Sequence, residues 1–287
     1  MISQLDPWEA KYILNLKNTD LLAFGDFEAW HRYPKHSWVY DKQALAHFTG
    51  VPTYDLEREI PDIIHYPYIV KPRTNFDGLS KDAYVVCSED EIEDWTGMIA
   101  QKFLEGHQGT SDVVLLNGVV LDSYSFTTHK NYYGEIKLFE SNPFVPLAVV
   151  NKLRDLFSGY TGVVNVEYIN SDILEIHLRP SLQFYDICGG LIQQLPKFME
   201  TGKWQKTKYS KTYSRIYRTK HDGFPEVKQL PEKPASITSI QLCWEDKKLL
   251  SETDPSLGRN RYMVINGTNL QEIENFGKKV NICIRDI

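Results

Sequence analysis

The segment from Gly162 to Ser181, GVVNVEYINSDILEIHLRPS, constrains the fold of this chain more than any other. Two stretches rich in β-branched residues flank a polar Asn-Ser-Asp step at 170–172, a pattern that predicts a β-hairpin. Side chains alternate between the two faces of a strand. One face of the hairpin therefore gathers polar and charged side chains: Asn165, Glu167, Glu175, His177 and Arg179.

Two interpretations of this polar face are open. It is either the solvated outside of an antiparallel sheet, where alternation of charged and apolar residues is ordinary, or a surface that meets a charged ligand. Two carboxylates and an arginine suit Mg²⁺ together with a polyphosphate. The remaining segments of the chain favour the second interpretation.

Composition sets the outer limits. The chain has 287 residues, of which 42% are hydrophobic and 13% aromatic, which is typical of a globular protein able to bury a substantial core. Its formal net charge of -6 gives no overall attraction to nucleic acid or to an anionic membrane. No apolar run approaches the length of a membrane span, and the first residues lack the pattern of a secretory signal. We therefore expect a cytoplasmic protein without a membrane partner.

The cysteines predict neither a zinc site nor a disulfide framework. They lie far apart, at Cys87, Cys188, Cys243 and Cys283, with no CxxC spacing.

Upstream of the hairpin, the pattern alternates between helix and strand. Asp41 is a typical N-cap for a helix that Gly50 ends. A strand is predicted over 66–72, a loop over 74–80, a second strand over 83–86 and a helix over 88–98. The segment 99–126 then predicts strand, connector, strand, a turn at 117–118 and another strand.

These segments resemble, in their order, the ATP-grasp family, which includes carbamoyl phosphate synthetase, biotin carboxylase and D-alanine ligase. The resemblance runs from about Pro34 to Gly190 and rests on several short motifs. It implies that Lys42 and Lys71 contact nucleotide phosphates, and that a loop containing Gly78 and Ser80 folds over them. A lysine fixed on a strand offers phosphate a point charge, and a glycine lets backbone N–H groups approach the anion. A strand-end lysine beside an ordinary turn is the alternative.

The resemblance also implies an adenine site at the connector. The family's sequence there is similar to the Gln101–Leu104 segment, whose backbone groups would hydrogen-bond adenine. The side-chain oxygen of Gln101 could accept a hydrogen bond from the adenine amino group. The implied nucleotide-binding residues are Gln101, Lys102, Leu104, Glu105 and Gln108. The family expects a carboxylate for the ribose hydroxyls near Gln108, where this chain has an amide, and Glu105 could substitute.

At the hairpin, the resemblance implies a metal and catalytic site. Glu167 and Glu175 would hold one or two Mg²⁺, and Arg179 would stabilise the transferred phosphoryl group or a tetrahedral intermediate. His177 stands where the family usually has asparagine, which implies Mn²⁺, an imidazole turned aside or an altered site. Lys130 is similar to a lysine that meets the γ-phosphate, and a solvated loop lysine is its alternative.

A basic and aromatic run follows, with seven Lys and Arg residues between 203 and 220 and no acidic residue. It could grip nucleic acid by charge and stacking, but the tyrosine spacing of four favours a helix packed on the core with solvated cations. In the tail, strands are predicted over 237–244 and 261–267, a helix over 269–276 and a closing strand over 280–284.

The sequence thus predicts an α+β protein of the ATP-grasp type. Its expected parts are a shortened leader over 1–41, a nucleotide and metal core over 42–200 and an α+β extension over 201–287. The implied activity is an ATP- and Mg²⁺- or Mn²⁺-dependent ligase that joins a small or peptide-like carboxylate to an amine. A nucleotide-binding module without turnover and an ATP-grasp kinase remain alternatives. A homodimer that completes the site is a further alternative.

Overall fold

The computed structural model describes residues 21–61, 66–74, 76, 82–93, 95–130, 136–218, 230–242 and 261–285. Within these ranges helices and antiparallel strands occur together, as expected for an α+β protein. The chain divides into two compact units. The first to be described consists of residues 20–123 and 144–180 and is called the hairpin unit. The other consists of residues 1–19, 124–143 and 181–287 and is called the tail unit.

The hairpin unit begins with short helices and contains a four-stranded antiparallel sheet of order β1-β4-β2-β3. Its helical elements are α2 (Asp26–Arg32), η3 (Ser37–Tyr40), α3 (Lys42–Thr49), η5 (Glu89–Glu91) and α4 (Leu147–Leu156). The strands of the sheet are β1 (Thr53–Asp55), β2 (Tyr68–Pro72), β3 (Tyr84–Val86) and β4 (Met98–Lys102). The predicted strands over 66–72 and 83–86 are confirmed.

The predicted hairpin is also confirmed. It consists of β8 (Gly162–Ile169) and β9 (Asp172–His177), and β8 pairs on its other side with β5 (Gln108–Leu116). Asn170 lies in the turn with a φ of 56°, a conformation that asparagine tolerates well. The strand β6 (Val119–Lys130) follows β5 through a tight turn at Asn117 and Gly118, as the sequence predicts, and its first residues, to 123, belong to this unit.

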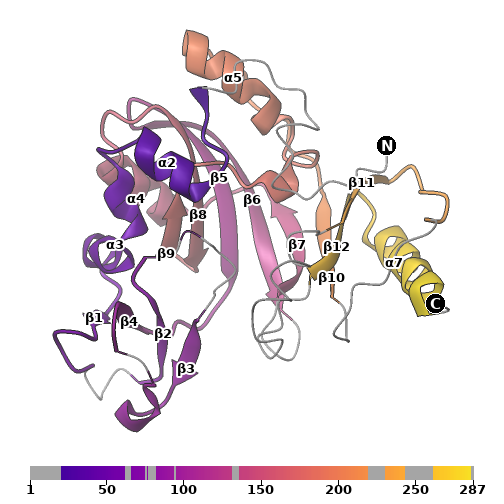
Figure 1. The fold of residues 1–287 in the computed structure, drawn as a ribbon. Coiled ribbons are helices and arrows are strands. Elements are labelled where there is room, and N and C mark those ends of the chain that lie inside the picture. The colour runs from indigo at the N-terminus through magenta and orange to yellow at the C-terminus, as the bar shows by residue number, and fades with distance from the viewer. Residues whose placement is uncertain are drawn as a thin grey trace. The chain divides into compact units, whose positions relative to one another are not determined.

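The apolar side chains of the hairpin build the core of this unit. Val164, Val166, Ile176 and Leu178 are at most 1% exposed and pack with residues of α2, η3, α3 and α4. Figure 1 shows these helices beside β8 and β9. Because neighbouring side chains point to opposite faces, the same register directs Asn165, Glu167, Glu175 and His177 away from that core.

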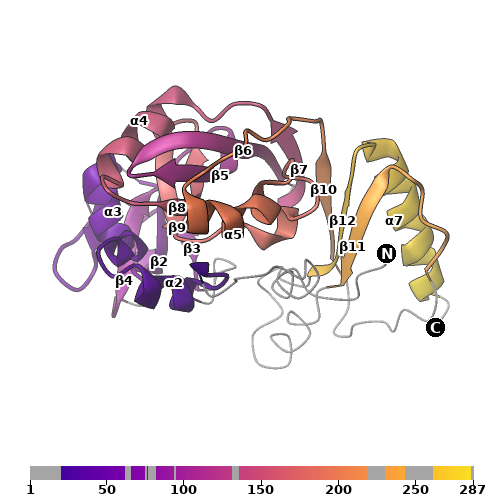
Figure 2. The ribbon, with the colours of Figure 1, turned by 90° about the horizontal axis from the view of Figure 1, so that it is seen from above.

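In the tail unit a second group of strands pairs in the order β6, β7, β10, β12, β11. Besides β6 from residue 124, its elements are β7 (Ile136–Asn142), η6 (Leu182–Phe184), α5 (Leu191–Thr201), β10 (Tyr213–Arg218), β11 (Ile237–Leu242), β12 (Arg261–Gly267) and α7 (Leu270–Arg285). Helix α7 lies along β11 and β12 in both ribbon views (Figures 1 and 2). Its buried residues Ile273, Phe276 and Val280 pack against Ile240, Met263 and Ile265.

Three secondary-structure predictions are wrong. Residues 280–284 continue α7 instead of forming a strand, because the spacing of Ile273, Phe276 and Val280 keeps one helical face on the sheet. The segment 203–218 is irregular and then enters β10, so its tyrosines do not follow a helix. Among the described residues of 88–97 the only helical element is η5, and Gly97 turns the chain at a φ of 66° directly before β4 begins at Met98.

Asp41 starts α3, as the sequence predicts. Its Oδ1 accepts hydrogen bonds from the N–H groups of Gln43 and Ala44 at 3.0 and 3.1 Å, and Gly50 ends the helix at a φ of 80°. Burial by itself would raise the pKa of Asp41, but hydrogen bonds from Arg73 and from the helix N–H groups outweigh it and lower that pKa. The charged carboxylate therefore stabilises the fold.

We predict that this contribution depends on pH. A carboxyl group with a lowered pKa in the folded state stabilises the protein above its unfolded pKa of about 3.9, and the effect is lost as the pH falls through the folded value. Asp41→Asn keeps a capping side chain but loses the charge, so we expect its free energy of unfolding to be lower than wild type by about 1 kcal/mol at pH 7. Urea unfolding should show this difference shrinking below about pH 4. A difference that does not change between pH 7 and about pH 3 would contradict the assignment.

A second prediction concerns Gly277 in α7. Alanine normally stabilises a helix interior relative to glycine by about 1 kcal/mol. Here an added Cβ would lie 2.1 Å from Cζ of Tyr217, whose hydroxyl donates a hydrogen bond to the Ile273 carbonyl at 3.0 Å. We expect Gly277→Ala to lower the free energy of unfolding by about 1–3 kcal/mol.

Urea unfolding of Gly277→Ala, with exposed Lys278→Ala as control, measures this effect. The double variant with Tyr217→Ala should show a smaller cost of the alanine at 277, because the clashing ring is gone. A more stable Gly277→Ala would show that α7 does not pack as described.

Candidate functional site

The polar face of the hairpin forms a cluster of charged side chains. Glu167 and Glu175 are direct neighbours across β8 and β9, and Asn165 lies opposite His177 in the same way. The cluster continues onto β5, where Asn165 donates hydrogen bonds to Asp112 Oδ1 at 2.9 Å and to Thr110 Oγ1 at 3.0 Å. The sequence therefore placed the right hairpin residues on one face, whereas the two β5 residues were not predicted.

Two buried lysines converge on this cluster. Lys42 opens α3 and Lys71 lies on β2, and the Nζ atom of each is 3.7 Å from the same oxygen, Oε1 of Glu175. Lys42 also donates a hydrogen bond to the Pro72 carbonyl at 3.3 Å. They are 7% and 6% exposed, so the two ammonium groups are largely withdrawn from water. The structure thus brings together Lys42, Lys71 and Glu175, which are far apart in the sequence.

The charges in the cluster shift one another's pKa values. Burial and repulsion by Glu175 raise the pKa of Glu167. Burial opposes ionisation of Glu175 as well, but Lys42, Lys71 and His177 outweigh it and lower its pKa. Burial, with the help of Lys42, lowers the pKa of Lys71 despite the two glutamates. A site of this kind, with like charges held close in pairs, suits an ionic ligand.

Asp26 anchors the other end of the cluster, and the sequence did not single it out. It is 6% exposed at the start of α2. Its carboxylate accepts hydrogen bonds from Arg179 at 2.7 Å and Tyr40 at 3.1 Å, and contacts His177 Nδ1 at 3.0 Å. Burial by itself would raise the pKa of Asp26, but His177 and Arg179 outweigh it and lower that pKa. A lone aspartate in an aromatic-rich segment carries no sequence signal for this role.

His177 is held as a partner of Asp26. Burial by itself would lower the pKa of His177, but the charge of Asp26 and its hydrogen bond raise it. The second ring nitrogen, Nε2, lies 3.8 Å from Oε2 of Glu175. Asp26 therefore fixes the orientation of the ring through Nδ1 and leaves Nε2 on the side of Glu175, so the metal role of His177 stays a prediction.

The two carboxylates of Glu167 and Glu175 suit a magnesium ion. No group of three or more His, Cys, Asp and Glu side chains is arranged to hold a metal among the residues that the structure describes. Mg²⁺, however, usually keeps several waters and takes one or two carboxylates. Glu167 and Glu175, opposite each other on adjacent strands, supply two.

The connector contains a buried polar atom without a hydrogen-bond partner among the described residues. Gln101 on β4 is 1% exposed, and its Nε2 donates a hydrogen bond to Thr53 Oγ1 at 3.2 Å, whereas no described group hydrogen-bonds its Oε1. A buried acceptor left in this way costs free energy unless a ligand or water reaches it. The backbone N–H groups of Lys102 and Phe103 already donate hydrogen bonds to the carbonyls of Pro52 and Pro67.

The other predicted site residues occupy different places. Leu104, Glu105 and Gln108 follow β4, and the Glu105 carbonyl accepts a hydrogen bond from the Asn170 side chain at 3.2 Å. Lys130 is exposed at the end of β6, in the tail unit. Gly78 and Ser80 lie outside the residues that the structure describes.

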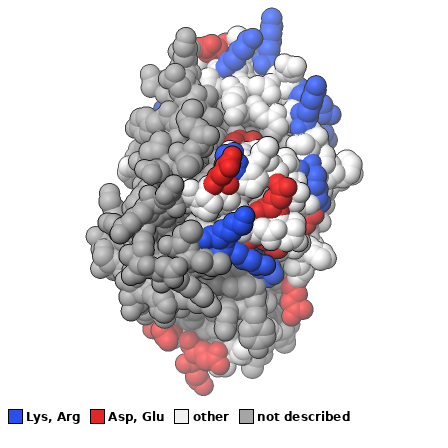
Figure 3. Space-filling view, turned by 90° about the vertical axis from the view of Figure 1, so that its right-hand side faces the viewer, with Lys and Arg blue, Asp and Glu red and all other residues white. Residues whose placement is uncertain are grey.

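The basic and aromatic run does not gain support as a nucleic-acid surface. Lys211, from this run, forms an ion pair with Glu140, which also contacts His129 at 3.0 Å. On the face of the molecule in Figure 3, the described Lys and Arg side chains are interspersed with Asp and Glu instead of forming one positive patch. Separately, no helix in the described part of the chain is long and apolar enough to cross a membrane.

The anchoring role of Asp26 generates a prediction. Removing one partner of a buried ion pair leaves an uncompensated charge. We expect Asp26→Ala to lower the free energy of unfolding by about 3–5 kcal/mol, because Arg179 is 6% exposed. Asp155→Asn on exposed α4 surface is the control, expected within about 0.5 kcal/mol of wild type. Urea unfolding measures both, and an Asp26→Ala value within about 1 kcal/mol of wild type would contradict the anchoring role.

Comparison with known proteins gives no match to a family model and none to a curated protein sequence. Solved structures do match. L-amino acid ligase from Bacillus licheniformis aligns with a TM-score of 0.53 and 14% identity, over 95% of this chain and 75% of that one. N5-carboxyaminoimidazole ribonucleotide synthetase from Thermus thermophilus aligns with a TM-score of 0.55 and 12% identity, over 86% of this chain and 73% of that one.

A third structure, N5-carboxyaminoimidazole synthetase from Staphylococcus aureus complexed with ADP, aligns with a TM-score of 0.55 and 12% identity, over 85% of this chain and 71% of that one. At 12–14% identity the likeness to these structures concerns the fold alone. The chain has the ATP-grasp fold that the sequence predicted.

Proposed function

We propose that the hairpin unit binds ATP and that the chain is an ATP-dependent ligase, activating a carboxylate for attack by an amine. The observation that carries the proposal is the convergence of Lys42 and Lys71 on Glu175, directly across the strand pair from Glu167. Two buried cations beside two carboxylates suit a polyphosphate with a divalent metal ion.

The lysines are the proposed phosphate ligands. Each Nζ is 3.7 Å from Glu175 Oε1, too long for a strong hydrogen bond, so both can turn toward phosphate oxygens. Their exclusion from water strengthens that attraction. Mg²⁺ held by Glu167 and Glu175 would neutralise phosphate charge when bound. Gly78 and Ser80 keep their proposed role in covering the phosphates.

The nucleoside end is proposed to lie at the connector. The unpaired Oε1 of Gln101 offers an acceptor for the adenine amino group, which would remove the cost of burying that oxygen. Because the N–H groups of Lys102 and Phe103 already donate hydrogen bonds within the protein, backbone N–H donors to adenine would come from Leu104 onward. Glu105 and Gln108 are the proposed partners of the ribose hydroxyls.

The proposed reaction has two steps. A substrate carboxylate oxygen attacks the γ-phosphorus of ATP, which breaks the bond to ADP and forms an acylphosphate. An amine nitrogen then attacks the acyl carbon and expels inorganic phosphate. Lys42 and Lys71 hold the polyphosphate in line, and Arg179 is the proposed cation for the developing charge. The ligase and synthetase names of the similar structures support this class of reaction. A small-molecule carboxylate and amine are the proposed substrates.

A second candidate, nucleotide binding without turnover, is favoured by one observation. The Arg179 guanidinium is buried and paired with Asp26 at 2.7 Å, so stabilising a transferred phosphoryl group requires it to move or to act at a distance. Product analysis distinguishes the candidates. A ligase forms the amide together with ADP and phosphate when an acid and an amine are both present, a kinase phosphorylates a hydroxyl, and a binding module forms no product.

The proposal predicts nucleotide binding that needs both the metal ion and Glu175. Calorimetric titration of ATP with Mg²⁺ or Mn²⁺ should show binding by wild type and at least about a tenfold loss in Glu175→Gln, because one metal carboxylate is removed. Asp172→Asn, which changes a half-exposed carboxylate at the start of the same strand, is the matched control. Wild-type protein that binds no ATP with either metal would sink the proposal.

A further inference from the structure

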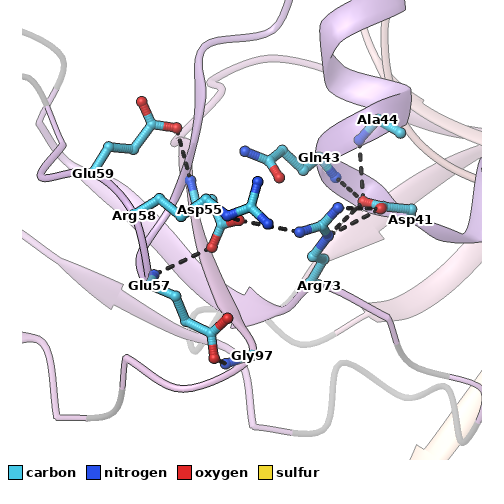
Figure 4. Close-up of polar contacts among 9 residues, drawn as sticks. All are labelled: Asp41, Gln43, Ala44, Asp55, Glu57, Arg58, Glu59, Arg73 and Gly97. Carbon is cyan, nitrogen blue, oxygen red and sulfur yellow. Dashed lines mark hydrogen bonds and ion pairs between the residues drawn. The ribbon is translucent and has the colours of Figure 1, made fainter.

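A charged network joins the start of α3 to the end of β2 (Figure 4). Arg73 directly follows β2, and its Nε and NH2 groups donate hydrogen bonds to both carboxylate oxygens of Asp41 at 2.6 to 3.0 Å. Its NH1 group donates to Asp55 at the end of β1, at 3.1 Å. The planar guanidinium thus connects three elements with fixed geometry, as a bidentate arginine does.

The backbone of Arg73 reinforces the same connection. Its carbonyl accepts a hydrogen bond from the Lys42 N–H at 3.0 Å, and its own N–H donates to the Gly97 carbonyl at 2.9 Å. Arg73 therefore contacts the first turn of α3 through both its side chain and its main chain. Asp41 in turn accepts hydrogen bonds from the N–H groups of Gln43 and Ala44, so the network includes the N-cap of α3.

The connected positions are the ones that carry the two buried lysines. Lys42 is next to Asp41, and Lys71 is two residues before Arg73 on the same strand end. The two ammonium groups repel each other, since each is 3.7 Å from one oxygen of Glu175. Glu175 attracts both ammonium groups, whereas their mutual repulsion by itself acts to separate α3 from β2. The Asp41–Arg73 pair opposes that separation, because its opposite charges attract each other across the same two segments.

We propose that Arg73 is a positioning residue that, through Asp41, holds Lys42 and Lys71 at the spacing required to bind a polyphosphate together. This inference rests on the proposed function. It extends that function to a residue that touches neither the carboxylates of the hairpin nor the lysine side chains. Asp55 fixes the guanidinium from the β1 side, so the position of the lysines is tied to the four-stranded sheet.

A positioning role differs from a purely structural role in which ligands it affects. If Arg73 only stabilised the unit, its loss would weaken the binding of every ligand equally. If it sets the lysine spacing, its loss weakens ligands that carry phosphates and leaves adenosine unchanged, because adenosine does not reach the lysines. Arg73→Gln removes the charge, and Arg73→Lys keeps the charge but loses the forked contact with Asp41.

The experiment measures the affinities of ATP, ADP and adenosine, with Mg²⁺ present, by calorimetry or ligand-observed NMR. Arg58→Gln is the matched control, because Arg58 is largely exposed and contacts Asp55 at 3.4 Å, with no contact to Asp41. We expect Arg73→Gln and Arg73→Lys to lose about tenfold in ATP and ADP affinity, with adenosine affinity unchanged. Asp41→Asn should likewise lose affinity for ATP and ADP and keep its affinity for adenosine. This variant replaces the Arg73 variants in the test if they do not fold.

The outcomes separate the inference from the proposed function. Wild-type protein that binds no ATP overturns both. Wild-type binding of ATP with an equal loss for adenosine and ATP in the Arg73 variants, or with no loss, overturns only the positioning role. An Arg58→Gln loss as large as that of Arg73→Gln would assign the effect to Asp55 and would also overturn it.

Discussion

Two glutamates paired directly across a hairpin are the constraint on which the hairpin unit depends. Like charges opposite each other in a sheet destabilise it, and here they are also partly removed from water. Cations from distant segments offset this repulsion, because Lys42 of α3 and Lys71 of β2 both form ion pairs with Glu175. The apolar side chains of the same strands fix the register, so the two carboxylates cannot move apart without exposing the core.

The second consequence of this arrangement is that the cations themselves need support. Asp41 and Arg73 hold the two lysine-bearing segments together, and Asp26 fixes His177 and Arg179 at the far end of the hairpin. Each is a buried or partly buried pair of opposite charges, which contributes geometry more than net stability. In the function that we propose, this cluster binds the anionic ligand, and Asp26, Asp41 and Arg73 form a supporting layer around it.

The sequence went far toward this site because its signals are local. Strand alternation placed Glu167, Glu175, His177 and Arg179 on one face, and the N-cap at Asp41 with the stop at Gly50 defined α3. Of the wrong secondary-structure predictions, one has a tertiary cause and another a local cause. Val280 and its β-branched neighbours favour a strand in isolation, yet packing of Ile273, Phe276 and Val280 on β11 and β12 keeps them helical. Gly97 ended a predicted helix by turning the chain into β4.

The sequence by itself determined the hairpin, its polar face and the resemblance to ATP-grasp proteins, since these follow from period-two alternation and from short motifs in order. Only the tertiary structure decided which residues meet. Asp26 and Arg179 are separated by 153 positions, and Lys42 and Lys71 share one oxygen of Glu175 although no spacing rule connects them. Contacts between distant segments depend on how the elements pack, and a single sequence carries no periodic signal for that packing.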